Sequence, residues 1–372
     1  MWVRGKGFLE LDVAEAQAFL DRIFTLNISF LVFTFGSLLW SNRTMVQLTP
    51  THVPQLQVFL AGAFGVISLV AFHFLIDYAA RFLRPVSLVA CVGKSGIEVV
   101  ESVYPHASRN AESAATEVPK RKWGFLPWAA RTAAVAAPSG TSLGAPARTV
   151  SHLGFSGIVL AVNVPALILE AQRADCVIEV APQVGDFVAV DEPLYYLYGN
   201  AAALDDRKLR SLIAFGTERT MEQDPLFAFR ILVDIALKAL SPAINDPTTA
   251  VLSIDQLHRL LRLVGLRSLR ADEFADFTGQ LRLIFRTPNW ENFVHITFRE
   301  IRACGANSLQ VVRRLRAMIE NLMQTLAGDR HVALREELEL LNRAITRHFA
   351  FSEDLALARI PDAQGLGGSA RK

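Results

Sequence analysis

Two long runs without a charged residue are the feature that most limits how this chain folds. No Asp, Glu, Lys or Arg occurs in residues 23–42 or in residues 44–76. A helix needs about 20 apolar residues to cross the hydrocarbon core of a bilayer, and two helices that are apolar on every side leave no face for water. The sequence therefore predicts a transmembrane hairpin over residues 22–84, with spans at about 23–42 and 56–76.

The basic residues around these runs predict the orientation of the hairpin. The loop between the spans carries only Arg43. More basic residues lie before the first span and after the second, at Arg4, Lys6, Arg22, Arg81, Arg84 and Lys94. Because cytoplasmic segments carry the excess of Lys and Arg, we expect both termini on the cytoplasmic side of a bacterial inner membrane. Residues 1–21, with an amphipathic stretch at 11–20, precede the first span.

His73 is the ionisable residue inside the predicted spans. An ionisable group within a membrane is a candidate for a proton or ion pathway. A neutral histidine that bonds to a neighbouring helix is the favoured interpretation, because Asp77 follows four residues later.

Composition excludes several classes of protein. Apolar residues make up 51% of the 372-residue chain, and the formal net charge is only +2. This balance argues against a nucleic-acid partner, since phosphate contacts need a concentrated basic face. The three cysteines are far apart, with no CxxC pair, which argues against a disulfide scaffold or a zinc site. We expect no cofactor and no metal.

The segments after the hairpin change in character twice. Residues 85–106 predict a juxtamembrane helix or strand-and-helix piece, broken at Gly93 and Gly96. Residues 107–148 are rich in Ala, Ser, Pro and Gly and predict a disordered linker. Its basic-aromatic cluster at 120–123 fits anionic lipid headgroups or a solvated linker equally well.

Short β-rich runs predict a small β-domain over residues 149–204. The order of SGIVL, VGDFV and EPLYYL resembles the barrel-sandwich hybrid fold of biotinyl and lipoyl domains. Such carriers need a lysine at a hairpin tip, and no lysine occurs between Trp123 and Arg207. The resemblance therefore implies the scaffold without its prosthetic group.

Helical periodicity dominates residues 205–358, where Ile254, Leu257, Leu261 and Val264 fall on one face. This periodicity predicts a helical cytoplasmic domain, followed by a disordered tail at 359–372. Asp246-Pro247 predicts a helix start, with Asp as the N-cap. Thr287-Pro288 predicts another start, and Gly305 its end. Leu281, Leu283 and Phe285 alternate and predict an isolated strand. The fold class is thus an α+β membrane protein.

The segment 216–255 carries the most informative motif, GTERTMEQDPLFAFRILVDIALKALSPAINDPTTAVLSID. It resembles the bacterial DUF2254 family of predicted membrane proteins, and the resemblance extends from about the first span to about residue 350. No activity is implied by it. Relatives have two further spans upstream, so we expect this chain to be naturally short or truncated at its start.

Polar residues of this motif form the candidate ligand or structural cluster. Its members are Glu218, Arg219, Asp224, Asp234, Asn245, Asp246, Thr248 and Thr249. Helix N-terminal amides at 247–249 bind anions well, and Glu218 or Asp224 has the chemistry of a general base. The bland interpretation is that these residues cap helices and form ion pairs that hold helices together.

Three functional hypotheses remain open. A membrane-anchored scaffold or sensor that binds a small molecule or a partner needs no chemistry that the sequence lacks, and we favour it. An oligomeric channel or transporter component is the first alternative, in which His73 would line the pore of a homo-oligomer. A membrane-bound enzyme is the second, and it is disfavoured because no catalytic motif is recognisable. The bilayer is the expected partner in all three.

Overall fold

The computed structural model describes residues 55–82, 85–104, 143–269 and 272–368, together with residues 25, 29, 32 and 36. The chain divides into two compact units. One is Lys6–Leu88, and the other comprises Met1–Gly5 and Val89–Lys372.

Helix α2 (Gln55–Phe82) accounts for most of what is described in the first unit. It contains the predicted second span, although the side chains at 56–58, 61 and 75 lie outside the described residues. The predicted first span lies outside them too, except at positions 25, 29, 32 and 36. In the part of the chain that the structure describes, no helix combines the length and the apolar character that crossing a membrane requires.

Helix α3 (Pro85–Val103) is one continuous helix, so the predicted break at Gly93 and Gly96 is wrong. From Val89 onward it belongs to the second unit. A β-carbon on Gly96 would lie 3.0 Å from the β-carbon of Ala228 and from a methyl group of Leu260. The glycine therefore permits close helix packing, a role that a local helix-breaker rule does not reveal.

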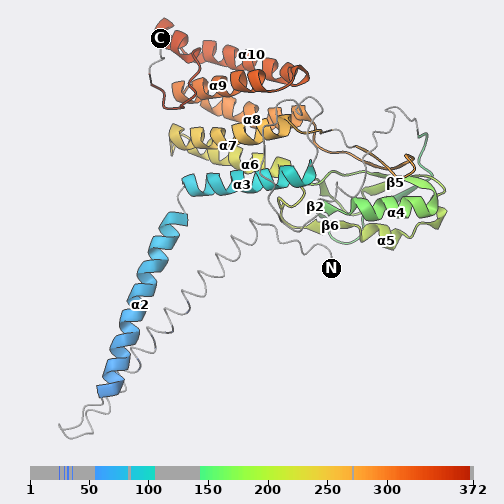
Figure 1. Ribbon diagram of the computed structural model, residues 1–372, viewed down its shortest axis with the longest axis horizontal. Helices are drawn as coiled ribbons and strands as arrows, with labels where there is room; N and C mark the ends of the chain where they lie inside the picture. The colour runs from blue at the N-terminus through green and yellow to red at the C-terminus, as the bar shows by residue number, and fades with distance from the viewer. Residues whose placement is uncertain are drawn as a thin grey trace. The chain divides into compact units, whose positions relative to one another are not determined.

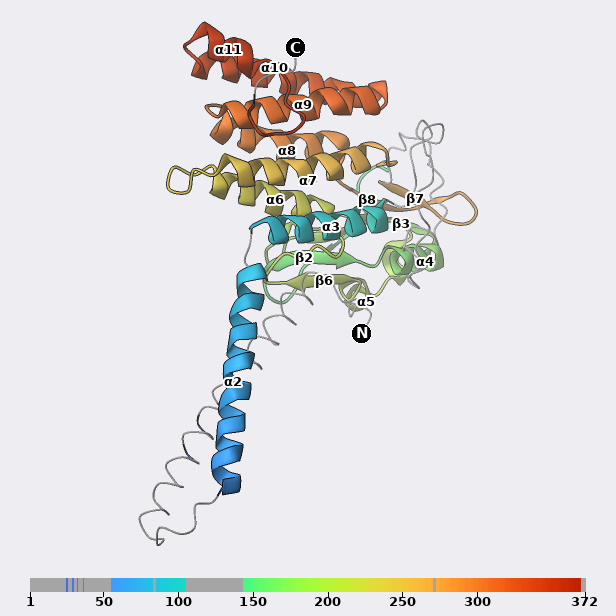
Figure 2. The same cartoon turned by 60° about the vertical axis from the view of Figure 1, so that its left-hand side comes forward.

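The helices of the second unit follow α3 in layers (Figures 1 and 2). They are α6 (Pro225–Ala239), α7 (Pro247–Gly265), α8 (Trp290–Gly305), α9 (Leu309–Thr325), α10 (His331–His348) and α11 (Ser352–Ala358), with a 3-10 turn at Gly328–Arg330. The predicted apolar face of α7 is buried, at Ile254, Leu257, Leu261 and Val264. Neighbouring layers pack through such apolar faces.

Helix α8 begins two residues after the predicted start at Pro288. Asn289 is its N-cap, and Asn289 and Asn292 exchange side-chain bonds with each other's backbone N–H groups. This reciprocal capping fixes the start of the helix more firmly than a proline at the first position would. The predicted end at Gly305 is confirmed.

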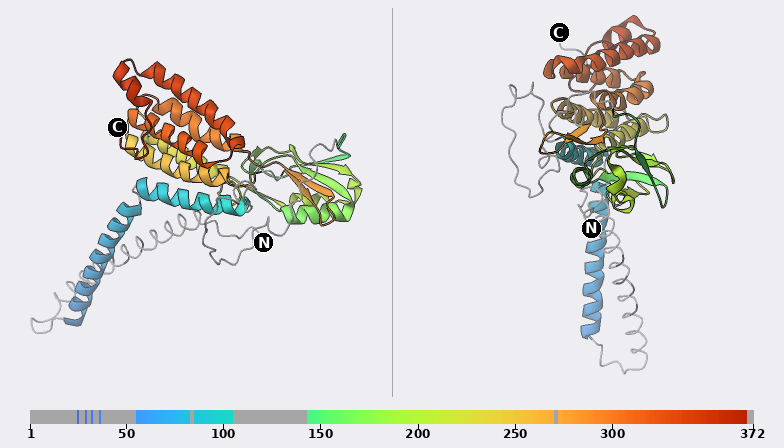
Figure 3. Two further views of the ribbon diagram at one scale, coloured as in Figure 1. Left: turned by 45° about the horizontal axis from the view of Figure 1, so that its top comes forward. Right: turned by 90° about the vertical axis from the view of Figure 1, so that its right-hand side faces the viewer.

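The β-part of the second unit contains two sheets (Figure 3). The five-stranded sheet has the order β1-β5-β3-β8-β7, in which only β3 and β8 are parallel, and the three-stranded sheet has the order β4-β2-β6. The strands are β1 (Arg148–Ser151), β2 (Gly157–Val162), β3 (Cys176–Val180), β4 (Phe187–Val188), β5 (Pro193–Gly199), β6 (Ile213–Gly216), β7 (Glu273–Ala275) and β8 (Leu281–Phe285). Two helices, α4 (Val164–Ala174) and α5 (Asp206–Arg210), and a 3-10 turn at Ala201–Ala203 connect them.

In contrast to the prediction of a helical domain, residues 205–358 are not purely helical, because β6, β7 and β8 lie in this region and complete both sheets. The strand predicted at Leu281–Phe285 exists, but it is not isolated: β8 lies between β3 and β7. The helix α4 also interrupts the predicted small β-domain. Alternation shows that a segment is a strand, but it does not identify a parallel partner about 100 residues away in sequence.

The predicted disordered tail is wrong up to residue 368. The buried guanidinium of Arg313 donates to the carbonyl oxygens of Ile360 and Gly368, at 3.1 and 2.5 Å. Asp362 accepts bonds from three backbone N–H groups of the following turn. A buried arginine needs such partners, and the tail supplies them.

The packing of α3 predicts different effects for one substitution at its two glycines. At Gly93→Ala the atoms nearest to the new carbon are Oε1, Cδ and Cγ of the flexible Gln256 side chain, which can rotate away, so helix propensity should raise the free energy of unfolding by up to about 1 kcal/mol. In Gly96→Ala the new methyl group would crowd Ala228 and Leu260, so the free energy of unfolding should fall by about 1 kcal/mol or more. Denaturant unfolding of both variants measures this, and equal effects would contradict the packing.

Candidate functional site

The eight candidate residues of the 216–255 motif fall into three separate groups. Asp224 precedes the first residue of α6, whereas Asp246 lies beyond its last. A 15-residue helix is about 22 Å long, so the two carboxylates cannot share one ligand. The motif therefore builds two helix starts and one ion-pair cluster, not a single pocket.

The group at the start of α7 satisfies its own polar atoms. Asp246 caps the helix by accepting from the Thr249 backbone N–H at 3.0 Å, and the Thr249 hydroxyl donates to its other oxygen at 2.6 Å. These bonds hold the pKa of Asp246 below its ordinary value. Asn245 has a left-handed φ of 47°, and Thr248 is exposed. The predicted helix start at Pro247 is confirmed.

The middle group is an ion-pair cluster between two layers of helices. Arg230 of α6 donates to Asp234 one turn later, and also to both oxygens of Glu300 on α8, at 2.7 and 3.0 Å. The Arg230–Asp234 pair has the four-residue spacing that is typical of ion pairs along a helix, whereas no local pattern reveals Glu300. The cluster ties α6 to α8.

The third group surrounds Asp224, whose side chain is only 4% exposed. Asp224 caps α6 by accepting from the backbone N–H of Phe227 at 3.1 Å. The turn between β3 and β4 presses against its other oxygen: a β-carbon on Gly185, where φ is +90°, would lie 2.5 Å from that oxygen and 3.7 Å from the guanidinium carbon of Arg219. Arg219 and Asp224 thus both lie beside Gly185, while Glu218 is exposed.

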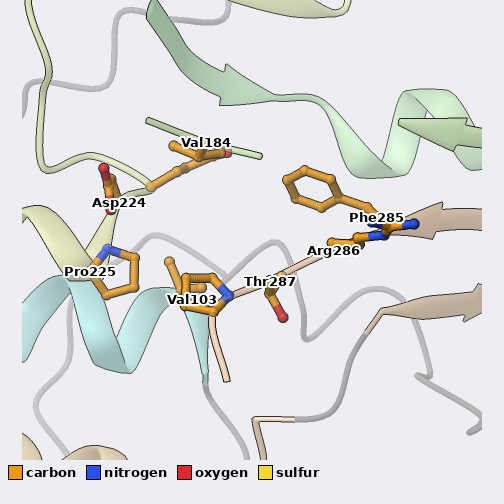
Figure 4. A pocket seen from close by; sticks show the side chains of 9 residues that line it. Val103, Val184, Asp224, Pro225, Phe285, Arg286 and Thr287 are labelled. Carbon is orange, nitrogen blue, oxygen red and sulfur yellow. The ribbon is translucent and has the colours of Figure 1, made fainter. Parts of the chain in front are cut away.

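A small cavity of about 20 Å³ lies beside Asp224 (Figure 4). Its walls come from four segments distant in sequence, and include Val103, Val184, Asp224, Phe285, Arg286 and Thr287. This volume suits about one water molecule and no drug-sized ligand. No sequence motif pointed to Val103, Arg286 or Thr287 as part of a site, because only the fold brings the ends of α3 and β8 to the start of α6.

Burial sets the charge behaviour of Asp224. Loss of solvation raises its pKa to about 6, although the Phe227 N–H and the positive charge of Arg219 oppose the rise. Asp224 and Asp246 occupy the same local motif, an Asp N-cap before a proline, yet their pKa values shift in opposite directions. The difference has a tertiary and a local cause: Asp224 is buried, whereas Asp246 accepts a bond from the Thr249 hydroxyl, for which Asp224 has Phe227 at the matching position. A buried carboxylate with a raised pKa is a candidate functional group.

These opposite shifts predict opposite effects of one substitution. Asn caps a helix as well as Asp does. The raised pKa of Asp224 means that its contribution to stability is complete below about pH 4 and is lost as pH rises through about 6. Asp224→Asn should therefore raise the free energy of unfolding at pH 7.5 by about 2 kcal/mol, with no gain below pH 4.

The matched control is Asp246→Asn. Because the pKa of Asp246 is lowered, its contribution is present above pH 4 and is lost on acidification, so this variant should be slightly less stable than the wild type at pH 7.5. Denaturant unfolding at both pH values measures the pair. Destabilisation by Asp224→Asn at pH 7.5 would contradict the assignment.

Comparison with known proteins finds one family. The family model described as "Predicted membrane protein (DUF2254)" matches residues 16–321. Uncharacterized proteins of Mycobacterium bovis and Mycobacterium tuberculosis are each 32% identical to this chain over 196 residues, which is 50% of the chain and 36% of each relative. The match thus spans about a third of the length of these curated relatives, and no solved structure matches the chain. Since the family model covers well over half of the sequence, the chain belongs to the DUF2254 family of predicted membrane proteins.

Proposed function

We propose that this chain is a membrane-anchored scaffold or sensor, in which a hairpin containing α2 holds the second unit at the cytoplasmic face of a bacterial inner membrane. The description of the family as membrane proteins supports the location. The excess of basic residues before the first span and after the second supports the orientation.

The surface of α2 is the observation that carries the proposal. Large apolar side chains are exposed along its middle: Phe59, Leu60, Val66, Ile67, Leu69, Val70, Phe72, Phe74 and Ile76. At about 100° of rotation per residue, Phe59, Leu60 and Phe72 face three different sides of the helix. An amphipathic helix on a water-soluble protein keeps one polar face. Apolar side chains on all sides suit the interior of a bilayer.

The arrangement of the second unit supports a sensing role. The cavity beside its buried carboxylate, Asp224, admits about one water molecule, so it has room for neither a substrate nor a small-molecule ligand. The unit joins a β-part and a stack of helices beside this carboxylate, and such a charged joint suits transmission of a signal.

Arginine substitutions in α2 test the anchor. Each arginine at the centre of a span costs about 2.5–3.5 kcal/mol of insertion free energy, so Val66→Arg combined with Val70→Arg should disrupt insertion of the hairpin. We expect the wild-type chain to float with membranes in a density gradient after an alkaline wash, and the variant to float much less.

The matched control is Leu153→Arg combined with Phe277→Arg, which changes two exposed apolar side chains of the second unit. This control should float like the wild type. Flotation separates lipid-bound protein from aggregates, and a wild-type chain that is released by the alkaline wash would overturn the anchor.

A further inference from the structure

An irregular segment, residues 217–223, connects β6 to α6 and is called the strap here. Its last residue, Gln223, accepts a hydrogen bond from the backbone N–H of Val162 in β2 at 3.0 Å. Arg219, in its middle, is exposed and lies beside Gly185, on the same turn that touches Asp224. The buried hydroxyl of Thr220 has no hydrogen-bond partner in the described part of the chain. Met221 is buried, so the exposed part of the strap is residues 217–219, which include Arg219.

We propose that Asp224 is a proton-binding group that controls the strap: the charged carboxylate attracts Arg219 and holds the strap against the β3–β4 turn, and the protonated carboxyl releases it. Because the ligand is a proton, a cavity with room for about one water molecule is large enough for proton transfer between Asp224 and water. The inference concerns the second unit alone and does not rest on the membrane anchor.

The strap, the β3–β4 turn and α6 all meet at the Asp224 carboxylate. Asp224 is fixed at the start of α6 by its bond to the Phe227 N–H. Gly185 leaves no space for a side chain between the turn and the carboxylate. A change of charge at this position therefore acts on the turn and the strap together, since neither carboxyl oxygen can move away without losing the cap or the contact.

Charged and titratable groups approach Asp224 from every element around it. They are Arg219 of the strap, Asp186 of the β3–β4 turn, Arg286 after β8 and Tyr104 at the end of α3. Arg219 lowers the pKa of Asp224 and Asp186 raises it, while burial is the largest cause of the rise to about 6. Protonation consequently falls between pH 5 and 7, where an ordinary carboxyl is fully charged.

Hydrogen exchange of the strap tests this inference on the full chain in lipid nanodiscs. Asp224→Asn serves as the reference at every pH, because it mimics the protonated carboxyl and cancels the intrinsic pH dependence of exchange. At pH 7.5 the wild-type strap should exchange about tenfold more slowly than the strap of Asp224→Asn, which corresponds to about 1.4 kcal/mol. At pH 5 the two should be equal, with a midpoint near 6.

Three further variants separate the charge effect from a general loosening. Arg219→Gln should exchange fast at all pH values, because the strap loses its partner. Asp186→Asn should move the midpoint to lower pH, because a repulsive charge is removed while its amide oxygen can still accept from the Gln183 N–H. Arg343→Gln, an exposed arginine of α10, should leave the midpoint unchanged.

Amides of β3 provide the internal standard, because they report the stability of the core. In Asp224→Asn they should exchange no faster than in the wild type, even as the strap exchanges faster. Equal strap exchange in the wild type and Asp224→Asn at pH 7.5 would overturn the proposal. So would faster exchange of β3 and the strap together, since this would be general destabilisation.

Discussion

Asp224, one of the buried carboxylates of the second unit, connects the parts of this unit. It caps α6 through the Phe227 N–H, lies against the glycine of the β3–β4 turn, and forms one wall of the cavity where α3 and β8 end. Burying a charged carboxylate costs free energy unless its partners compensate. Here the compensation is incomplete, as the raised pKa indicates. Such a group is retained at a cost to stability, which is typical of functional sites.

Two buried arginines of the unit have better compensated charges. Arg313 of α9 is bonded to backbone carbonyl groups of the C-terminal segment. Its neighbour Arg314 donates to Asp255 at 2.7 Å and to His258 at 3.1 Å, and burial together with Arg314 lowers the pKa of this histidine. These bonds tie α9 to α7 and to the chain end. By contrast, the charge of Asp224 is incompletely compensated, so protonation at the joint between the β-part and the helices changes the stability of the unit.

The local rules of sequence predicted elements well and their partners poorly. Asp-Pro pairs correctly predicted the start of α7, and apolar spacing correctly predicted its buried face. The same rules predicted a helix break at Gly96, because they do not show that Ala228 and Leu260 pack there. Nor did they reveal that β8 pairs with β3, since parallel pairing leaves no trace in the alternation of one strand.

The candidate site shows the same division. The motif supplied Arg219 and Asp224, and the structure brings these two together. The structure separates Arg219 and Asp224 from Asp246 by the length of α6. It also adds residues of α3 and β8 to the cavity wall, and no motif marks these residues. The raised pKa of Asp224 arises from tertiary burial, whereas the lowered pKa of Asp246 arises from its local bonds to Thr249. Sequence therefore identified the residue types of the site, whereas their chemistry depends on the fold.

Direct titration of the Asp224 carboxyl carbon tests the central claim. Aspartate labelled with ¹³C in the full chain would be followed by NMR from pH 4 to pH 8, with Asp224→Asn identifying the resonance. The account predicts a midpoint near 6 for Asp224, and for Asp246 a midpoint below the ordinary value of an aspartate. A midpoint near 4 for Asp224 would contradict it, because the carboxylate would then be as well solvated as one on the surface.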